Sequence, residues 1–185
     1  MALSLLNWTA MRFSIKILTA ITLLLGVFSP TSSNAITVAE LRKIPNLTPE
    51  KFASYFADFE FKFHNDVQNH STFLATKSGD CDDYATLAAD ILGRNGYTTR
   101  LIAVRMKGET HVVCYVNETD SYLDYNYRKD TKKTVPCSKV LTEIARMVAQ
   151  SFERDWIATY QFTFSQGVKR LVQTIVTNEK AEKTS

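Results

Sequence analysis

Two stretches of the chain repeat apolar residues every three to four positions, the spacing of one helix face. One begins after Thr48-Pro49, an N-cap residue followed by a first-turn proline. The other runs from Asp80 to Asn95-Gly96, where glycine can adopt the positive φ that ends a helix. Both predict helices whose apolar faces are covered. Those faces consist of Phe52, Tyr55, Phe56, Phe59 and Phe63 in the first stretch, and Tyr84, Leu87, Ala88 and Ile91 in the second.

The rest of the chain alternates shorter apolar runs with turn residues. Helices are expected over 140–152 and, as a short terminal element, over 168–176, whereas polar residues 65–77 suggest a loop. Extended runs with turn residues between them predict three strands joined as an antiparallel meander, and a fourth follows later. These strands are Leu101–Val104, His111–Val116, Tyr122–Tyr125 and Trp156–Phe164. The pattern therefore predicts an α+β domain with a helix packed on an antiparallel sheet.

The N-terminal residues have the pattern of an export signal. Arg12 and Lys16 precede the apolar run Ile17–Phe28, which is shorter than an ordinary membrane span. Ser33-Asn34-Ala35 supplies the small residues that a signal peptidase reads, so cleavage is expected after Ala35; an uncleaved anchor is the alternative. Residues 36–185 would then form one domain, exported to the periplasm or secreted, with no stable membrane insertion after cleavage.

Charge and cysteine count narrow the function classes. The chain carries 22 basic and 19 acidic residues, a net charge of +3, and two of the basic residues lie in the predicted leader. The remaining domain is nearly neutral, which argues against nucleic acid or an anionic membrane as partner. Three cysteines leave at least one thiol outside any internal disulfide. Cys114 and Cys137 could pair or could both be free thiols; Cys81 is the third.

Three side chains suit a cysteine nucleophile. Cys81 lies at the predicted start of a helix, where unpaired N–H groups and the helix dipole favour a thiolate and could stabilise an oxyanion. His111 lies on the second strand, and the next strand of the hairpin can set Asp124 beside it. The imidazole would move the proton and Asp124 would orient the imidazole. Asp120 and Asn126 are competing orienters.

The acidic neighbours of Cys81 oppose this chemistry, because negative charge nearby disfavours a thiolate. Asp80, Asp82 and Asp83 could be absorbed as caps by N–H groups of the first helical turn. Alternatively, a hard cation such as Ca²⁺ could bind their oxygens and neutralise them.

Two other interpretations involve the same residues. Cys81 and His111 could be ordinary structural residues, since an isolated cysteine on a helix is usually a small buried hydrophobe. A zinc site of Cys81, His111, Cys114 and Cys137 is a poor alternative, because residues three apart on a strand point to opposite faces and no CxxC pair exists.

From Ser78 to Tyr127 the chain resembles the transglutaminase-like superfamily of the papain-like group. The segment Gly79-Asp80-Cys81-Asp82-Asp83-Tyr84-Ala85 is most similar to bacterial transglutaminase-like cysteine proteinases, which are exported and include periplasmic proteases of surface adhesins. The resemblance implies a papain-like core and a catalytic triad of Cys81, His111 and Asp124. It also implies that Asp80 and Asp82 are the residues that would hold calcium, as some periplasmic members do.

The expected activity is hydrolysis of a peptide or isopeptide bond through a thioester. The substrate would be a protein or peptide, and the triad itself requires no cofactor. If an amine resolved the thioester, the same site would crosslink proteins. A non-catalytic exported binding module that keeps the fold is the alternative from another class.

Overall fold

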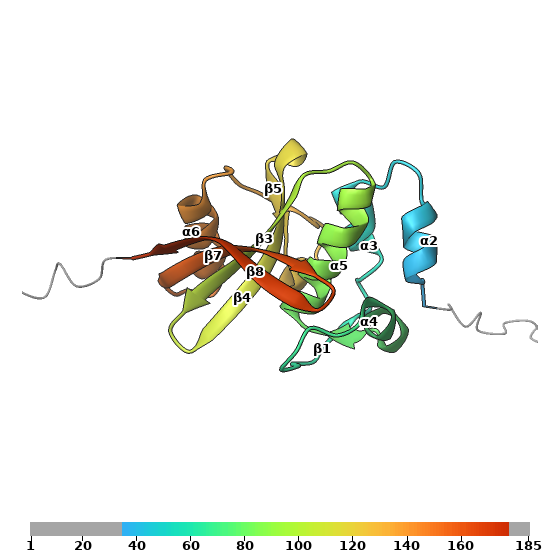
Figure 1. Ribbon diagram of the computed structural model, residues 1–185, viewed down its shortest axis with the longest axis horizontal. Coiled ribbons are helices and arrows are strands. Elements are labelled where there is room, and N and C mark those ends of the chain that lie inside the picture. Colours follow the sequence, from blue (N-terminus) through green and yellow to red (C-terminus); the bar gives the residue numbers. More distant parts are fainter. Residues whose placement is uncertain (1–34, 178–185) are drawn as a thin grey trace, which may run out of the picture. The chain divides into compact units, whose positions relative to one another are not determined.

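The computed structural model describes residues 35–177 (Figure 1). The predicted export signal lies outside these residues, except for Ala35. The helices and short 3₁₀ turns are α2 (Val38–Lys43), α3 (Pro49–Ser54), α4 (His70–Thr76), α5 (Cys81–Arg94), η1 (Asn117–Thr119), η2 (Tyr125–Tyr127) and α6 (Leu141–Ser151). No helix among the described residues is long and apolar enough to cross a bilayer.

Six strands form the main sheet, in the order β6-β5-β4-β3-β7-β8 with every neighbouring pair antiparallel. They are β3 (Thr99–Met106), β4 (Glu109–Val116), β5 (Ser121–Leu123), β6 (Val135–Pro136), β7 (Trp156–Ser165) and β8 (Val168–Val176). Two residues each of β1 (Glu60–Phe61) and β2 (Ser78–Gly79) pair in parallel as a separate small sheet. The predicted meander is present as β3-β4-β5, and the fourth predicted strand is β7.

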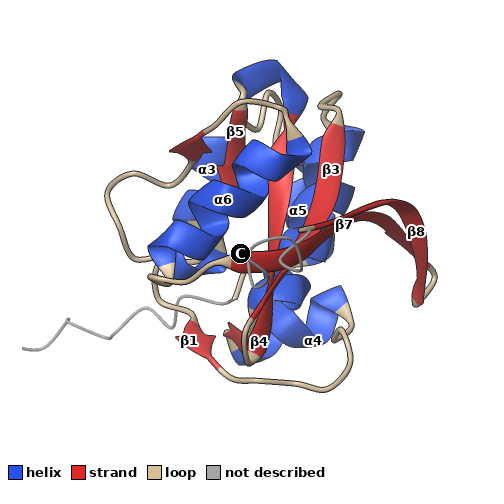
Figure 2. Ribbon diagram, turned by 90° about the vertical axis from the view of Figure 1, so that its left-hand side faces the viewer, coloured by secondary structure: helices blue, strands red, loops and turns tan. Residues whose placement is uncertain are grey.

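The sheet separates two hydrophobic clusters, with α5 on one face and α6 on the other (Figures 1 and 2). Along β4, Val112, Cys114 and Val116 belong to the α5 cluster, whereas Val113 and Tyr115 belong to the α6 cluster. This alternation is the two-residue period of a strand covered on both faces. The predicted fold class, a helix packed on an antiparallel sheet, is confirmed.

The two-sided core also decides between the cysteine arrangements. Cys114 is buried in the α5 cluster and Cys137 in the α6 cluster, so the sheet lies between them. All three cysteines are free. Of the two alternatives for Cys114 and Cys137, the structure therefore has two free thiols and not a disulfide.

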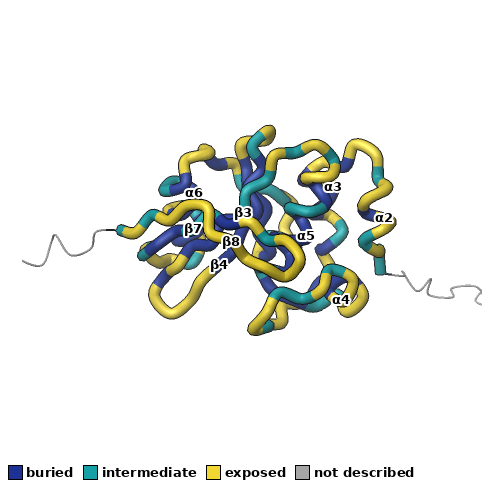
Figure 3. Tube along the Cα trace, viewed as in Figure 1, coloured by how far each residue is buried: buried dark blue, intermediate teal, exposed yellow. Residues whose placement is uncertain are grey.

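The predicted terminal helix at 168–176 is wrong, because these residues form β8. Gln166 and Gly167 both have positive φ and make a tight turn after β7, which returns the chain as a hairpin. The run is rich in β-branched residues, which favour strands, and the hairpin partner supplies the hydrogen bonds. Eight of its nine residues are exposed, so the helical spacing of its apolar residues does not correspond to a buried face (Figure 3).

The segment before α5 also differs from its prediction. The first predicted helix is short: α3 ends at Ser54, and the chain turns before entering β1. Phe52, Phe56 and Phe59 are still buried, whereas Phe63 is 70% exposed. The predicted loop over 65–77 contains α4, capped by the Asn69 side chain, which accepts a hydrogen bond from the Ser71 N–H.

Candidate active site

Cys81 is the first residue of α5, as predicted, and Asp80 is the N-cap. Its N–H therefore has no acceptor four residues back within the helix and is free to serve a ligand. The Cys81 residue is half-buried. Gly79 fixes this approach, because a Cβ there would lie 2.5 Å from Asp83 Oδ2 and 2.6 Å from the buried Phe73 ring. Only glycine lets the chain enter α5 this close to both.

His111 and Asp124 meet across the β4-β5 hairpin. His111 Nε2 lies 2.8 Å from Asp124 Oδ1, and the two residues are 6% and 1% exposed. Asp124 lies one residue beyond β5 and caps η2, where its Oδ1 also accepts the Asn126 N–H at 2.8 Å. Since Nε2 faces Asp124, Nδ1 is the ring nitrogen left to face the thiol.

The surroundings of His111 favour its charged form. Burial alone would lower its pKa, but the charge and hydrogen bond of Asp124, together with a smaller contribution from the Cys81 side chain, raise it to about 10. The Cys81 contribution requires the thiol to interact with the ring. The structure thus brings His111 and Asp124 into contact, and the Cys81 side chain adds to the raised pKa of His111.

The competing orienters do not contact His111. Asp120 accepts a hydrogen bond from the Tyr115 hydroxyl at 3.2 Å. Asn126 contributes only its backbone N–H, which it donates to Asp124. Asp124 is therefore the acidic residue that the hairpin places on the imidazole.

The three acidic neighbours of Cys81 differ in how their oxygens are satisfied. Asp83 is fully buried and accepts three hydrogen bonds, from the Asp80 N–H and from both the backbone and side-chain nitrogens of Gln68. It acts as a structural cap, as the first alternative predicted. Asp80 accepts the His64 N–H through Oδ2 alone, and Oδ1 of both Asp80 and Asp82 is buried without a partner.

Asp80, Asp82 and Asp83 offer oxygens that lie within 4.8 Å of one another. Burial, followed by a hydrogen bond to Asp80 and the charges of Asp80 and Asp83, raises the pKa of Asp82 to about 7. Clustered carboxylate oxygens without donors are the ligands of a hard cation. The residues fit calcium, with Asp80 and Asp82 providing the unpartnered oxygens.

The alternative zinc site is not assembled. Cys114 and Cys137 lie in clusters on opposite faces of the sheet, and among residues 35–177 the acidic trio is the one group with metal-binding spacing. Four ligands around one ion need to share a single centre.

Comparison with known proteins gives the family. The family model described as a transglutaminase-like domain matches residues 32–128, a range that includes Cys81, His111 and Asp124. The chain belongs to the transglutaminase-like family. The predicted family is thereby confirmed. No functionally curated protein matches the chain. Among solved structures, calcium-bound LapG of Legionella pneumophila is similar, with a TM-score of 0.46 and 16% identity over 73% of this chain and 74% of that one.

Three residues of this transglutaminase-like site were missed from the sequence. The Phe152 ring, just after α6, packs on His111 with centroids 4.9 Å apart and helps to bury it. Gln68, from the segment predicted as a loop, anchors Asp83. Gly79 precedes the N-cap, and its steric requirement was the one readable signal, since glycine before a capped helix often marks a close backbone approach.

Proposed function

We propose that this protein is an exported cysteine hydrolase that cleaves a peptide or isopeptide bond of a protein substrate. The observation that carries the proposal is the 2.8 Å contact between His111 Nε2 and Asp124 Oδ1, and it is supported by the position of Cys81 at the start of α5, where its side chain contributes to the raised pKa of His111. Membership of the transglutaminase-like family supports the reaction class. Export to the periplasm or the medium is part of the proposal, on the leader pattern of residues 1–35.

In this mechanism the Cys81 thiolate attacks the carbonyl carbon of the scissile bond. The Cys81 N–H donates to the oxygen that becomes negative. The tetrahedral intermediate collapses as protonated His111 gives its Nδ1 proton to the leaving amine, which departs and leaves a thioester on Cys81. His111 then takes a proton from water, the resulting hydroxide attacks the thioester, and the acid is released as Cys81 recovers its thiolate. Asp124 holds the imidazole with Nδ1 toward the sulfur throughout.

Calcium has a supporting role in this proposal. Asp80 and Asp82 would hold it, and the ion would neutralise carboxylates beside Cys81. Cys81, His111 and Asp124 carry out the reaction. Asp83 and Gln68 fix the first turn of α5, and Asp80 and Asp82 would hold the cation.

The test is the reactivity of Cys81 and the effect of its removal. A thiol-directed probe is expected to label Cys81 faster than Cys137, whose thiol pKa is raised mainly by burial. Cys81→Ala is expected to lower peptide cleavage by at least about 10⁴-fold, as nucleophile removal does in hydrolases. Cys137→Ala is the matched control and is expected to keep activity.

The outcome also separates the alternatives. If the probe labels Cys81 no faster than Cys137, and Cys81→Ala leaves cleavage of a peptide mixture unchanged, the enzyme proposal is wrong and a binding module remains. Products analysed by mass spectrometry in the presence of a primary amine distinguish hydrolysis from crosslinking. Hydrolysis gives free acids, whereas a crosslinking enzyme gives amine adducts.

A further inference from the structure

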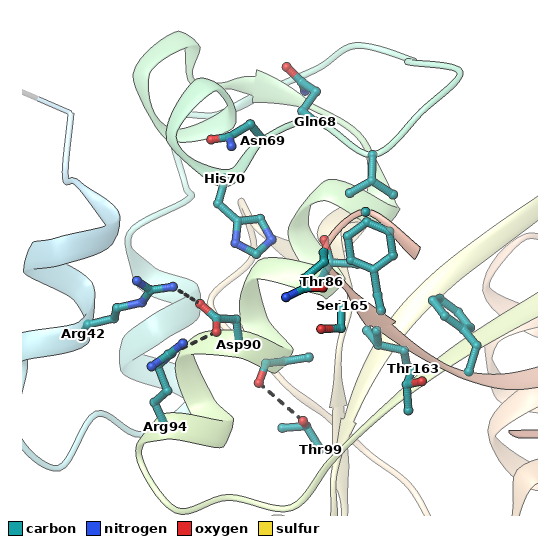
Figure 4. Close-up of a pocket in the computed structure, with 17 residues that line it drawn as sticks. Arg42, Gln68, Asn69, His70, Thr86, Asp90, Arg94, Thr99, Thr163 and Ser165 are labelled. Carbon is teal, nitrogen blue, oxygen red and sulfur yellow. Dashed lines mark hydrogen bonds and ion pairs between the residues drawn. The ribbon is translucent and has the colours of Figure 1, made fainter. Parts of the chain in front are cut away.

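A cleft of about 700 Å³ lies beside α5, between the tip of the β7–β8 hairpin and the segment that leads into α4 (Figure 4). None of Cys81, His111 and Asp124 lines it. Its α5 wall begins at Thr86, whose hydroxyl donates to the Asp82 carbonyl oxygen, and continues through Ala89 and Asp90. Because these positions are spaced by three to four residues, they continue the face of α5 that starts at Asp82.

The hairpin side of the cleft offers a free strand edge. The pairing of β7 with β3 ends at Phe162, whereas its pairing with β8 continues to Ser165. On the side away from β8, Thr163–Ser165 therefore have no strand partner among the described residues. Unpaired backbone groups along an edge are the template on which an extended peptide adds as a strand.

The cleft is apolar near this edge. Phe162, Phe164 and Leu101 line it, and the Lys169 ammonium lies 4.7 Å from the centroid of the Phe162 ring. Lining residue Thr86 donates its hydroxyl to the Asp82 carbonyl oxygen, so the cleft lies along the face of α5 that starts at Asp82.

The far end of the cleft is cationic. Arg42 from α2 and Arg94 from α5 approach Asp90 from two sides, at 2.7 Å and 2.9 Å (Figure 4). Both Asp90 oxygens are occupied by these contacts, whereas each guanidinium gives up a single one of its five N–H groups. Two cations around one carboxylate leave a net positive charge and free donors suited to another carboxylate.

The separation of Cys81 and Asp90 along α5 sets the length of peptide that could connect the nucleophile with the cationic end of the cleft. Asp90 is nine residues after Cys81 in α5, so at 1.5 Å per residue it lies about 14 Å farther along the helix axis. An extended chain covers about 3.3 Å per residue, so this separation corresponds to about four residues of a bound peptide.

We propose that the cleft binds an extended segment of the substrate polypeptide as a strand added to β7 at Thr163–Ser165. An apolar side chain of that segment packs on Phe162 and Phe164, and an acidic side chain about four residues from the scissile bond pairs with Arg42 and Arg94. The protein thereby selects an acidic residue at a fixed distance from the cleavage site. This inference rests on the proposed function, because it takes the bound peptide to be the substrate.

Binding of synthetic decapeptides to the Cys81→Ala variant tests the cleft without the chemistry. The probes share one Phe and carry Glu, Gln or Lys at each spacing from it. Glu peptides of one spacing are expected to bind best, and Arg94→Gln is expected to weaken them about fivefold while leaving Gln peptides unchanged. Arg94→Gln keeps the Arg42–Asp90 pair, so α2 stays attached. Phe164→Ala should weaken all Phe-containing probes.

Arg146→Gln is the matched control, since Arg146 is an exposed arginine that pairs with Glu143 on α6. Equal binding of Glu, Gln and Lys peptides, or equal losses in Arg94→Gln and Arg146→Gln, would overturn the cleft assignment even if the wild-type protein cleaves peptides. Selective binding of Glu peptides that the wild-type protein leaves intact would instead overturn the substrate role. Selective binding together with cleavage of the same peptides supports both.

Discussion

The two sides of Cys81 contrast in how their charges are satisfied. On the side of the sheet, the buried Asp124 carboxylate meets a histidine at 2.8 Å and a backbone N–H at the same distance. On the side of α5, Asp80 and Asp82 each bury an oxygen without a donor, and burial beside like charges raises the pKa of Asp82 to about 7. Asp124 also buries one oxygen, Oδ2, without a donor, but its charge faces His111, whereas Asp80 and Asp82 face each other with an excess of negative charge.

The difference shows which buried negative charges the fold itself compensates and which need a proton or a cation from the solvent. A buried carboxylate is tolerated when a cation and donors face it, and otherwise takes up a proton or binds a metal. As long as both groups are charged, the folded chain itself therefore compensates the buried charge of Asp124 with that of His111. The Asp80–Asp82 pair is expected to change with pH or with a bound cation.

The largest effect is expected from breaking the His111–Asp124 pair. Asp124→Ala removes the acceptor that orients His111 and is expected to lower kcat/KM for peptide cleavage by about 10²–10⁴-fold, the range for a group that positions a general acid and base. Steady-state cleavage kinetics measure this, with circular dichroism to verify folding. Retention of more than a tenth of the wild-type kcat/KM would show that Asp124 has no positioning role.

The same pair predicts a pH dependence of stability. Its raised His111 pKa of about 10, against 6.5 ordinarily, means that the stabilisation is fully present below pH 6.5 and is lost as the pH rises through about 10. Asp124→Asn removes the charge but keeps an oxygen. The difference in unfolding free energy between wild type and Asp124→Asn should therefore be constant below pH 6.5 and decrease toward pH 10. Urea titrations measure it, and a difference independent of pH would contradict the assignment.

Substitution of Gly79 tests the close packing that positions the start of α5. Gly79→Ala puts a Cβ 2.5 Å from Asp83 Oδ2 and 2.6 Å from Phe73. Because Phe73 is buried and Asp83 is held by three hydrogen bonds, neither can move freely, and unfolding should become easier by about 1–3 kcal/mol. Gly93→Ala is the matched control: it meets nothing within 4 Å and lies inside α5, so it should stabilise by about 0.5–1 kcal/mol. Equal effects in urea unfolding would contradict this explanation.

The His111–Asp124 pair was also the more predictable part of the site from the sequence. A strand–turn–strand pattern sets the hairpin register, so the proximity of Asp124 to His111 followed from local spacing. The start of α5 followed equally from the capped amphipathic run. Both depend on residues near each other in the chain, which periodicity reports well.

What could not be predicted depends on distant contacts. Gln68 contacts Asp83, and Phe152 contacts His111, although these residues are far apart in the sequence and no periodic pattern of residues reveals the contact. The error at β8 has a related cause. Val168, Leu171, Val172 and Val176 fit a helix period, but the preceding turn and the partner β7 decide the conformation, and both strand faces are largely exposed.

We expect the Asp80–Asp82 side of Cys81 to respond to calcium. Because the pKa of Asp82 is about 7, a cation must displace a proton below that pH, so calcium should stabilise the protein more about one unit above pH 7 than one unit below it. At ten times the dissociation constant the gain is about 1.4 kcal/mol. Thermal melts with calcium and with a chelator measure it, and Asp82→Asn should abolish it while Asp155→Asn does not. Equal melting temperatures with calcium and chelator above pH 7 would contradict a calcium site.

The smallest effect is expected at Asp120, which lies in the connection between β4 and β5 and does not contact His111. Its Oδ1 accepts the Tyr115 hydroxyl at 3.2 Å, but the same hydroxyl lies 2.9 Å from the Cys137 carbonyl oxygen, which remains available as acceptor. Asp120 has a φ of 42°, a conformation that asparagine also tolerates. Asp120→Asn should therefore change kcat/KM by less than about twofold, since a surface change of this kind alters free energies by about 0.5 kcal/mol at most. A tenfold loss in cleavage kinetics would mean that charge near the imidazole matters without contact, and that Asp124 acts by more than orientation.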